Sequence, residues 1–167
     1  MNSYLERLRQ GLEDATAGAS EADLALAPAG KWCAAQIMEH LLLTYKGTNS
    51  GLEKCLEQGT PLARRATIKD RLAVLLVVGF GHLPEGRAAP ERTRPRGFAP
   101  EEVRQACDSE LKKMVERLDA CEVKFGTGTK ITDHPFIGPL TPNQWRKFHW
   151  VHGRHHMRQI RERMGRS

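Results

Sequence analysis

Four of the seven histidines of the chain lie in one segment near its C-terminus, WRKFHWVHGRHHMRQI. Read as a helix at about 100° per residue, this segment places His152 and His156 one turn apart on one face. The rest of that face is mostly apolar and carries Trp145, Phe148, Gln159 and Ile160. Imidazoles pack poorly on a buried stripe but are good ligands for a divalent metal. The spacing therefore predicts a metal site.

A further ligand must come from another helix, because two side chains rarely complete a coordination shell. His40 is the only histidine between Lys31 and Gln58, and it lies on the inward face of the helix expected there, beside Ile37, Leu41 and Thr44. Alone it would be typical of a hydrogen-bonded core histidine. Beside an HxxxH pair on another helix, it is expected to be the third ligand. Three neutral histidines with an open coordination position are typical of catalytic metal sites.

Two other histidines of the C-terminal segment compete for the same role. His149 and His155 lie about 60° to either side of His152 on a helix, which favours flanking or surface positions for them. The zinc-protease motif HExxH is excluded, because Gly153 stands where its glutamate would be.

Four long helices are expected to position these residues, with no convincing strand pattern. They are expected to begin near Ser3, near Lys31 (ending about Gln58), after Pro100, and at Thr141, a natural N-cap followed by Pro142. A short helical turn is expected within residues 21–27. No repeat or internal boundary is visible, so the sequence predicts a single all-α domain over residues 1–167, a four-helix bundle with an extra short helix and a proline-rich loop.

Two segments between the long helices are less regular. Ile68–Phe80 is apolar nearly all round, which predicts a buried helix; a strand is the alternative. Four prolines in residues 81–100 exclude a continuous helix there. This proline-rich loop (residues 83–100) is the best candidate for a segment that moves or shapes the mouth of a pocket.

Charge and composition narrow the classes of partner. The net charge is +6, and residues 146–166 hold seven Lys/Arg against Glu162 alone. These basic residues are expected to face solvent near a helix C-terminus, although they could also meet an anionic substrate. Nucleic-acid binding is not favoured, because no interleaved aromatics or recognition motif accompany them.

The remaining composition is that of a protein expected in the cytoplasm. The N-terminal residues lack the apolar core of a signal peptide, and the longest apolar run, Leu72–Phe80, is too short to span a bilayer. Four cysteines without CxxC spacing (33, 55, 107 and 121) are expected to be reduced.

Two histidine motifs together resemble the DinB/YfiT-like superfamily. They are W-x3-Q-x3-H at Trp32, Gln36 and His40, and H-x2-HH-x2-Q at His152, His155, His156 and Gln159. The stretch HPFIGPLTPNQW is similar to one largely uncharacterised branch of that superfamily. The resemblance implies an up-down-down-up four-helix bundle, often paired as a homodimer, that holds a divalent metal, commonly zinc or nickel. By position, the ligands would be His40, His152 and His156, with Gln159 beside the site.

The resemblance also implies a range of reactions. Some members are thiol S-transferases that use bacillithiol, mycothiol or a related thiol, and others are described as metal-dependent hydrolases. The proline-rich loop and the HPFIG segment depart from the family pattern and could build a different pocket.

The leading hypothesis is therefore a metal-dependent enzyme acting on a small molecule, most like a thiol S-transferase, in which the metal activates a low-molecular-weight thiol or water. Gln159 would orient a ligand or substrate. His134 is the candidate acid/base, with a surface loop histidine as the alternative; Cys33 could approach the same cleft or be an inert thiol. Two rival hypotheses remain: a non-catalytic metal- or ligand-binding bundle, and a core of hydrogen-bonded histidines without metal.

Overall fold

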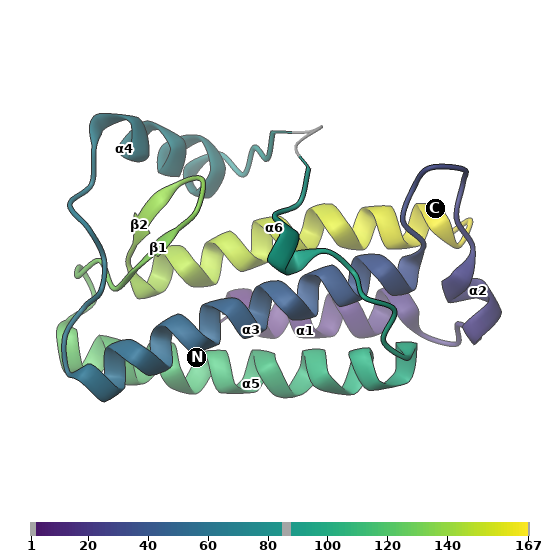
Figure 1. The fold of residues 1–167 in the computed structure, drawn as a ribbon, viewed down its shortest axis with the longest axis horizontal. Coiled ribbons are helices and arrows are strands. Elements are labelled where there is room, and N and C mark those ends of the chain that lie inside the picture. The colour runs from purple at the N-terminus through teal and green to yellow at the C-terminus, as the bar shows by residue number, and fades with distance from the viewer. Residues whose placement is uncertain (1–2, 85–87, 167) are drawn as a thin grey trace.

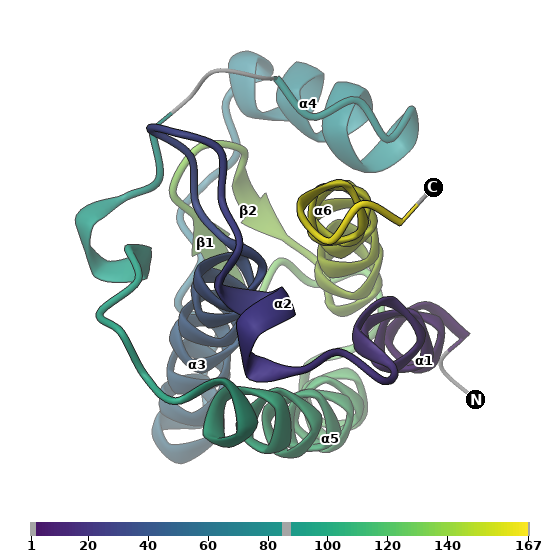
Figure 2. The same ribbon diagram turned by 90° about the vertical axis from the view of Figure 1, so that its right-hand side faces the viewer.

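Residues 3–84 and 88–166 are described by the structure, a computed structural model, and most of them are helical. Four long helices lie side by side, as the end-on view shows (Figures 1 and 2), and their buried side chains form a shared apolar core. They are α1 (Ser3–Thr16), α3 (Ala34–Gln58), α5 (Pro100–Phe125) and α6 (Pro142–Arg163). The smaller elements are α2 (Glu21–Ala25), α4 (Ile68–Val74), a π-helical turn η1 (Leu75–Gly79), a 3-10 turn η2 (Glu91–Thr93), β1 (Thr132–His134) and β2 (Gly138–Leu140). The predicted helical class is confirmed in this general form.

The N-terminal caps explain where the helices begin. The Thr141 hydroxyl accepts a hydrogen bond from the Gln144 backbone N–H, and the Gln144 side chain accepts one from the Thr141 N–H. This capping box confirms the predicted start of α6. At α3, Gln36 accepts a hydrogen bond from the Cys33 N–H, so the helix begins at Ala34 rather than near Lys31. Gln36 serves this cap and its side chain is exposed, so it does not lie on the inward face of α3 that carries His40.

Close packing of α1 against α6 depends on a glycine. A Cβ added at Gly153 would lie 2.1 Å from Cδ1 of Leu8, which is fully buried. Gly153 directly follows His152, the first of the two predicted ligands of α6. Packing against α1 therefore accounts for the missing side chain at this position, where a zinc protease has its glutamate.

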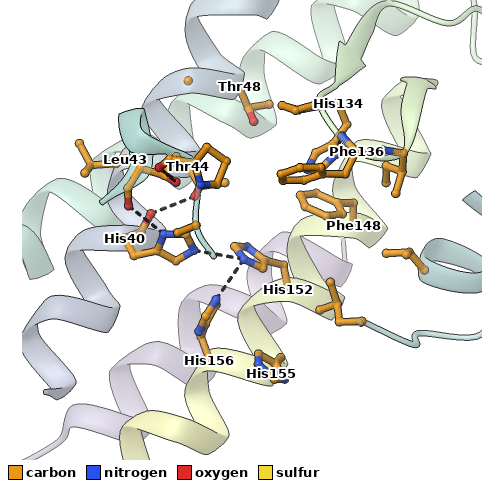
Figure 3. Close-up of a pocket in the computed structure, with 18 of the residues that line it drawn as sticks. His40, Leu43, Thr44, Thr48, His134, Phe136, Phe148, His152, His155 and His156 are labelled. Carbon is orange, nitrogen blue, oxygen red and sulfur yellow. Dashed lines mark hydrogen bonds between the residues drawn. The ribbon is translucent and has the colours of Figure 1, made fainter. Parts of the chain in front are cut away.

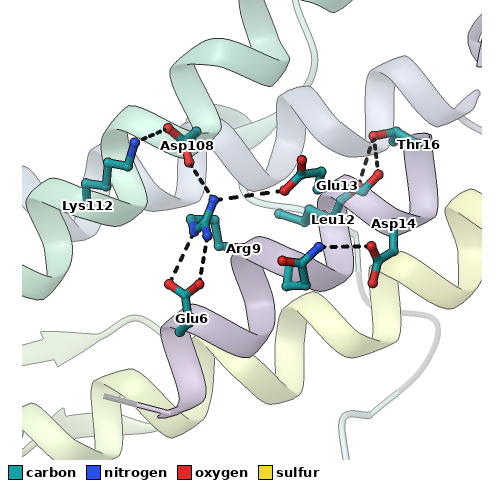
Figure 4. Close-up of polar contacts among 9 residues, drawn as sticks. Glu6, Arg9, Leu12, Glu13, Asp14, Thr16, Asp108 and Lys112 are labelled. Atoms are coloured by element: carbon teal, nitrogen blue, oxygen red, sulfur yellow. Dashed lines mark hydrogen bonds and ion pairs between the residues drawn. The ribbon is translucent and has the colours of Figure 1, made fainter. Parts of the chain in front are cut away.

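One basic residue of α6 does not face solvent as predicted. The Arg146 side chain is buried and forms ion pairs with Asp119 at 2.5 Å and Glu122 at 2.7 Å, both on α5. Because a buried guanidinium needs charged partners, these two carboxylates fix the α5–α6 contact at that level. A second group of ion pairs joins α1 to α5, where Arg9 pairs with Glu6 at 2.7 Å and reaches Asp108 of α5 at 3.5 Å (Figure 4).

The prediction of a helix at Ile68–Phe80 is confirmed, but the prediction that this helix is buried is wrong. The segment forms α4 and η1, which lie outside the bundle against β2 and α6 (Figures 1 and 2). Ile68 is 79% exposed and Phe80 is 74% exposed, while Val77 and Val78 face inward. Asp70 anchors the start of α4, since its carboxylate binds Arg64 at 2.6 Å and caps the helix through Thr67. The apolar face of Ile68, Leu72, Leu75, Leu76 and Phe80 is left largely in solvent.

A short antiparallel hairpin precedes α6, although the sequence showed no convincing strand pattern. Thr132 pairs with Leu140 and His134 with Gly138. Gly138 has a φ of +78°, and a Cβ there would lie 2.5 Å from Oδ1 of Asp70, so only glycine fits this close approach of α4. None of the helices in the described ranges is long and apolar enough to cross a membrane.

Candidate metal centre and its cavity

The structure brings together the three histidines predicted as ligands, one from α3 and two from α6 (Figure 3). Nε2 of His152 lies 3.1 Å from Nε2 of His156 and 3.4 Å from Nε2 of His40. All three candidate ligand atoms lie within 4.8 Å of one another. One point in space is therefore within reach of three ring nitrogens.

Hydrogen bonds to the other ring nitrogens orient two of these rings. Nδ1 of His40 lies 2.9 Å from the carbonyl oxygen of Thr93, and Nδ1 of His156 lies 2.7 Å from Oε1 of Gln159. Both acceptors are oxygens, so each Nδ1 carries the hydrogen and donates it. The Nε2 lone pairs of His40 and His156 consequently point toward the shared position, as in metal sites whose histidines are oriented from behind.

Burial keeps the three rings in their neutral form. Desolvation lowers the pKa of His40, and it lowers the pKa of His156 to about 3, with the neighbouring His40 adding to the effect. The pKa of His152 falls well below its usual value because of burial and then the proximity of His156 and His40. Neutral imidazole is the form that binds a metal.

Without a cation, the three Nε2 atoms cannot all take part in hydrogen bonds with one another. With the hydrogens of His40 and His156 on Nδ1, two lone pairs face Nε2 of His152, which could donate to only one of them. Nδ1 of His152 is buried and has no hydrogen-bond partner among the described residues, so the ring hydrogen belongs on Nε2 in the metal-free protein and would move to Nδ1 when a metal binds. A divalent cation would accept the lone pairs of all three rings, and its usual Zn–N distance of about 2.0–2.1 Å requires only a small convergence. The residues present thus fit a metal ion.

Gln159 has a defined place behind His156. Its Oε1 accepts from His156, and its amide nitrogen lies 3.2 Å from Nε2 of His155. It therefore contacts a predicted ligand and does not reach the shared position itself. The predicted positioning role of Gln159 fits this arrangement and stays a prediction.

The proline-rich loop is anchored to α3 by two adjacent residues. Thr93 of η2 binds His40, as above. Glu39 is 1% exposed, and its carboxylate accepts hydrogen bonds from the backbone N–H groups of Arg96 at 2.5 Å, Gly97 at 2.9 Å and Phe98 at 3.2 Å. The described part of the loop is thus an ordered wall of the site, and sequence analysis missed Glu39 because its partners lie more than fifty residues away.

A cavity of about 1350 Å³ opens in front of the histidines. Its apolar wall includes Leu76, Val77, Phe136, Trp145 and Phe148. The cationic side chains along it are Lys31, Lys54, Lys69, Arg92, Arg158 and Arg163, against the carboxylates of Asp133 and Glu162. Its volume is above the range of about 300–1,000 Å³ that is usual for small-molecule sites, so it has room for a small molecule, and its charge favours an anionic ligand. Cys33 does not line this cavity, so the structure leaves it as the N-cap of α3.

His134 lines the same cavity, from β1 rather than from a surface loop. Its Nδ1 accepts hydrogen bonds from the backbone N–H groups of Phe136 at 3.2 Å and Ile137 at 3.4 Å, so Nε2 carries the ring hydrogen. Its ring lies 4.3 Å from that of Phe148. Burial and the charge of Arg92 lower the pKa of His134 to about 4. It is therefore a neutral hydrogen-bond donor near pH 7, and a role in proton transfer stays a prediction.

His149 is not the flanking or surface residue that its helical angle favoured. It is 0% exposed, and its Nε2 lies 3.1 Å from Oγ1 of Thr48. Its ring stacks on Trp145, and burial lowers its pKa to about 3. At its level α6 is covered both by the bundle and by the hairpin, so the buried arc is wider than one stripe. His155 is half-buried beside His156, close to its predicted flanking position.

Comparison with known proteins assigns the chain to a family without assigning it a role. No curated protein and no solved structure matches it. A family model described as "Protein of unknown function (DUF1569)" matches residues 7–163, and the chain belongs to this family.

Proposed function

We propose that this protein is a divalent-metal-dependent enzyme in which His40, His152 and His156 hold the metal, with a thiol S-transferase-like reaction as the leading possibility. One observation carries the proposal. Three neutral imidazoles direct Nε2 toward one position, and two of them are fixed from behind by oxygen acceptors. The order of the long helices and the two histidine motifs also suit a bundle of the DinB/YfiT-like type.

The cavity favours catalysis over simple metal storage. Three protein ligands leave a coordination position, and an open space of about 1350 Å³ lies in front of them. A divalent ion bound there would lower the pKa of a thiol or water and so supply a nucleophile near neutral pH. The chain's own groups would bind the substrate: Phe148 packs against its apolar part, and His134 donates a hydrogen bond to it.

Metal content is the first test. Protein purified without a histidine tag should contain about one equivalent of metal, and the single variants His40→Ala, His152→Ala and His156→Ala should each lose most of it. His82→Ala is the matched control, because His82 lines the cavity but lies outside the cluster. Equal and negligible metal in all five proteins, after incubation with Zn²⁺ or Ni²⁺, would refute the proposal.

Turnover is the second test. The metal-loaded protein should accelerate the reaction of a cellular thiol with a chromogenic electrophile, and His152→Ala should abolish that acceleration. Stoichiometric metal without turnover of thiols or hydrolysable esters would instead support a non-catalytic metal-binding bundle.

A further inference from the structure

We infer that Thr48, His134 and Arg92 form a subsite for an anionic oxygen group of the substrate, such as a carboxylate, in the part of the cavity beyond Phe148. This inference rests on the proposed function, because the other end of the same molecule would reach the histidine cluster. The three side chains come from α3, β1 and η2, and all line the cavity. Figure 3 shows Thr48 and His134 together, on the side of Phe148 away from His156.

His134 offers a fixed donor. Two backbone N–H groups occupy its Nδ1, so its ring hydrogen is on Nε2. Within the part of the chain that the structure describes, no group accepts a hydrogen bond from this Nε2. A ligand oxygen in the cavity would do so.

Thr48 offers a second donor because of the buried His149. Nδ1 of His149 has no partner in the described ranges. A buried N–H without an acceptor is rarer than a buried acceptor without a donor, so the hydrogen belongs on Nε2, which then donates to Oγ1 of Thr48. Because the Thr48 oxygen accepts from His149, its own hydrogen must point away from His149. Thr48 lines the cavity, so this hydrogen can be donated to a ligand there.

Arg92 adds the charge. It directly precedes Thr93, which binds His40, and its charge contributes to the lowered pKa of His134. No carboxylate pairs with Arg92 among residues 3–84 and 88–166, whereas its neighbour Arg94 pairs with Glu91 at 2.9 Å. A charged, bidentate donor of this kind suits a carboxylate or phosphate.

One carboxylate, that of Asp133, lies next to His134 in the chain and lines the same cavity. Asp133 adjoins His134 in β1, and successive side chains of a strand point to opposite faces. Its Oδ2 accepts a hydrogen bond from the Arg64 backbone N–H at 3.3 Å. The subsite therefore presents three donors, and Asp133, which also lines the cavity, has one of its carboxylate oxygens bound to Arg64.

The spacing limits the shape of the substrate. Thr48 follows His40 by eight residues, which is about 12 Å along α3. Phe148 lies between, with its ring stacked on His152 at 5.5 Å and against His134 at 4.3 Å. The substrate class is thus a molecule with a metal-reaching group such as a thiol, an apolar middle about 6–8 bonds long, and an anionic end.

Thiols of graded length test this inference on protein loaded with Co²⁺, whose visible absorption changes when a thiol binds. Mercaptopropionate, mercaptohexanoate and mercaptooctanoate would be compared with mercaptoalcohols of the same chain lengths, in which a hydroxyl replaces the carboxylate. We expect the two longer carboxylates to bind about tenfold more tightly than their alcohols, and the shortest to show little difference. Arg92→Gln should reduce that ratio about threefold or more, Thr48→Val should reduce it in the same direction, and Arg94→Gln should leave it unchanged.

A metal-free arm separates the two proposals. Inorganic phosphate, titrated against tryptophan fluorescence, should bind the wild type more tightly than Arg92→Gln. Equal affinity for carboxylates and alcohols, with a normal thiol absorption band, would overturn the subsite and leave the metal centre standing. If Co²⁺ does not bind, the proposed function fails; loss of phosphate binding in Arg92→Gln would then still support the subsite, and identical titrations would overturn it.

Discussion

The carbonyl oxygen of Thr93 lies 2.9 Å from Nδ1 of His40, although 53 residues separate the two in the chain. This contact sets the tautomer of a predicted metal ligand from a loop that has almost no regular structure. Glu39, which directly precedes His40, accepts hydrogen bonds from three backbone N–H groups of the same loop. The orientation of His40 therefore depends on the position of this loop.

Glu39→Gln should weaken both the loop and the metal site. An amide offers one acceptor oxygen where the carboxylate offers two, so a buried N–H loses its partner and the free energy of unfolding should fall by about 1–3 kcal/mol. Metal affinity should fall by about tenfold or more as Thr93 shifts. Urea unfolding and a metal-competition titration measure these effects.

Glu53→Gln is the matched control for that variant, since Glu53 is an exposed residue of α3 that pairs with Arg117 at the surface. Its unfolding free energy should change by less than about 1 kcal/mol. Equal effects of the two substitutions would contradict the role given to Glu39.

Gln159→Leu should lower metal affinity without unfolding the protein. The substitution keeps the approximate size of the side chain and removes the oxygen that accepts from Nδ1 of His156. Loss of such an outer partner typically lowers metal affinity by about 10–100-fold. Gln105→Leu, at an exposed position of α5, should leave affinity unchanged. A normal metal affinity in Gln159→Leu would show that His156 needs no such partner.

Gly153→Ala should destabilise the protein even though alanine is the better helix former. The new methyl would overlap Leu8, and a fully buried leucine has little room to move. Overpacking of this kind costs about 1–3 kcal/mol, which outweighs the gain of about 1 kcal/mol in helix propensity. Thermal unfolding measures the loss.

The double variant Leu8→Ala/Gly153→Ala checks the cause. Its loss of stability should be smaller than the sum of the two single losses, because the cavity left by Leu8 accepts the new methyl. Strict additivity would rule out the steric explanation.

Acid should destabilise the metal-free protein in part through His149. Burial lowers the pKa of His149 to about 3, from 6.5 when exposed. Between these values the unfolded chain binds a proton that the folded state does not, so the free energy of unfolding falls as the pH is lowered through that window. Above pH 6.5 His149 is neutral in both the folded and the unfolded chain, so the stability that is lost in acid is fully present there.

His149→Gln measures the part of this pH dependence that is due to His149, because glutamine can still form a hydrogen bond with Thr48 but does not titrate. Between about pH 6 and 4 its unfolding free energy should change with pH by up to about 1.4 kcal/mol per unit less than that of the wild type. Urea unfolding at several pH values, with a chelator present, gives the two slopes. Parallel slopes would mean that His149 is protonated in the folded protein.

Local patterns predicted much of the helical frame and the three clustered histidines. The cap of Thr141 and Pro142 determines the start of α6 by itself, and the spacing of His152 and His156 follows from helical geometry. His40 could be added because its inward face was visible in the sequence. The cluster is thus predictable from periodicity within each helix.

What the sequence could not predict depends on contacts between distant segments. The burial of His149 requires the hairpin that covers α6, and that hairpin has three-residue strands that contain Gly138 and Pro139 and show no alternation. The exposure of Ile68–Phe80 likewise depends on where the short α4 docks, because an all-round apolar segment cannot reveal which side meets the bundle. The Glu39 contact joins a helix to a loop whose sequence gives no sign of it.

The position of α4 and η1 outside the bundle also has a dynamic consequence. Inward-facing Val77, Val78 and Asp70 attach this segment, while its larger apolar side chains gain little from burial. Backbone amides there should exchange with deuterium well before those of α3 and α6, through local openings that leave the bundle folded. Since Leu76 and Val77 form part of the cavity wall, each such opening would widen the route by which a ligand enters and leaves.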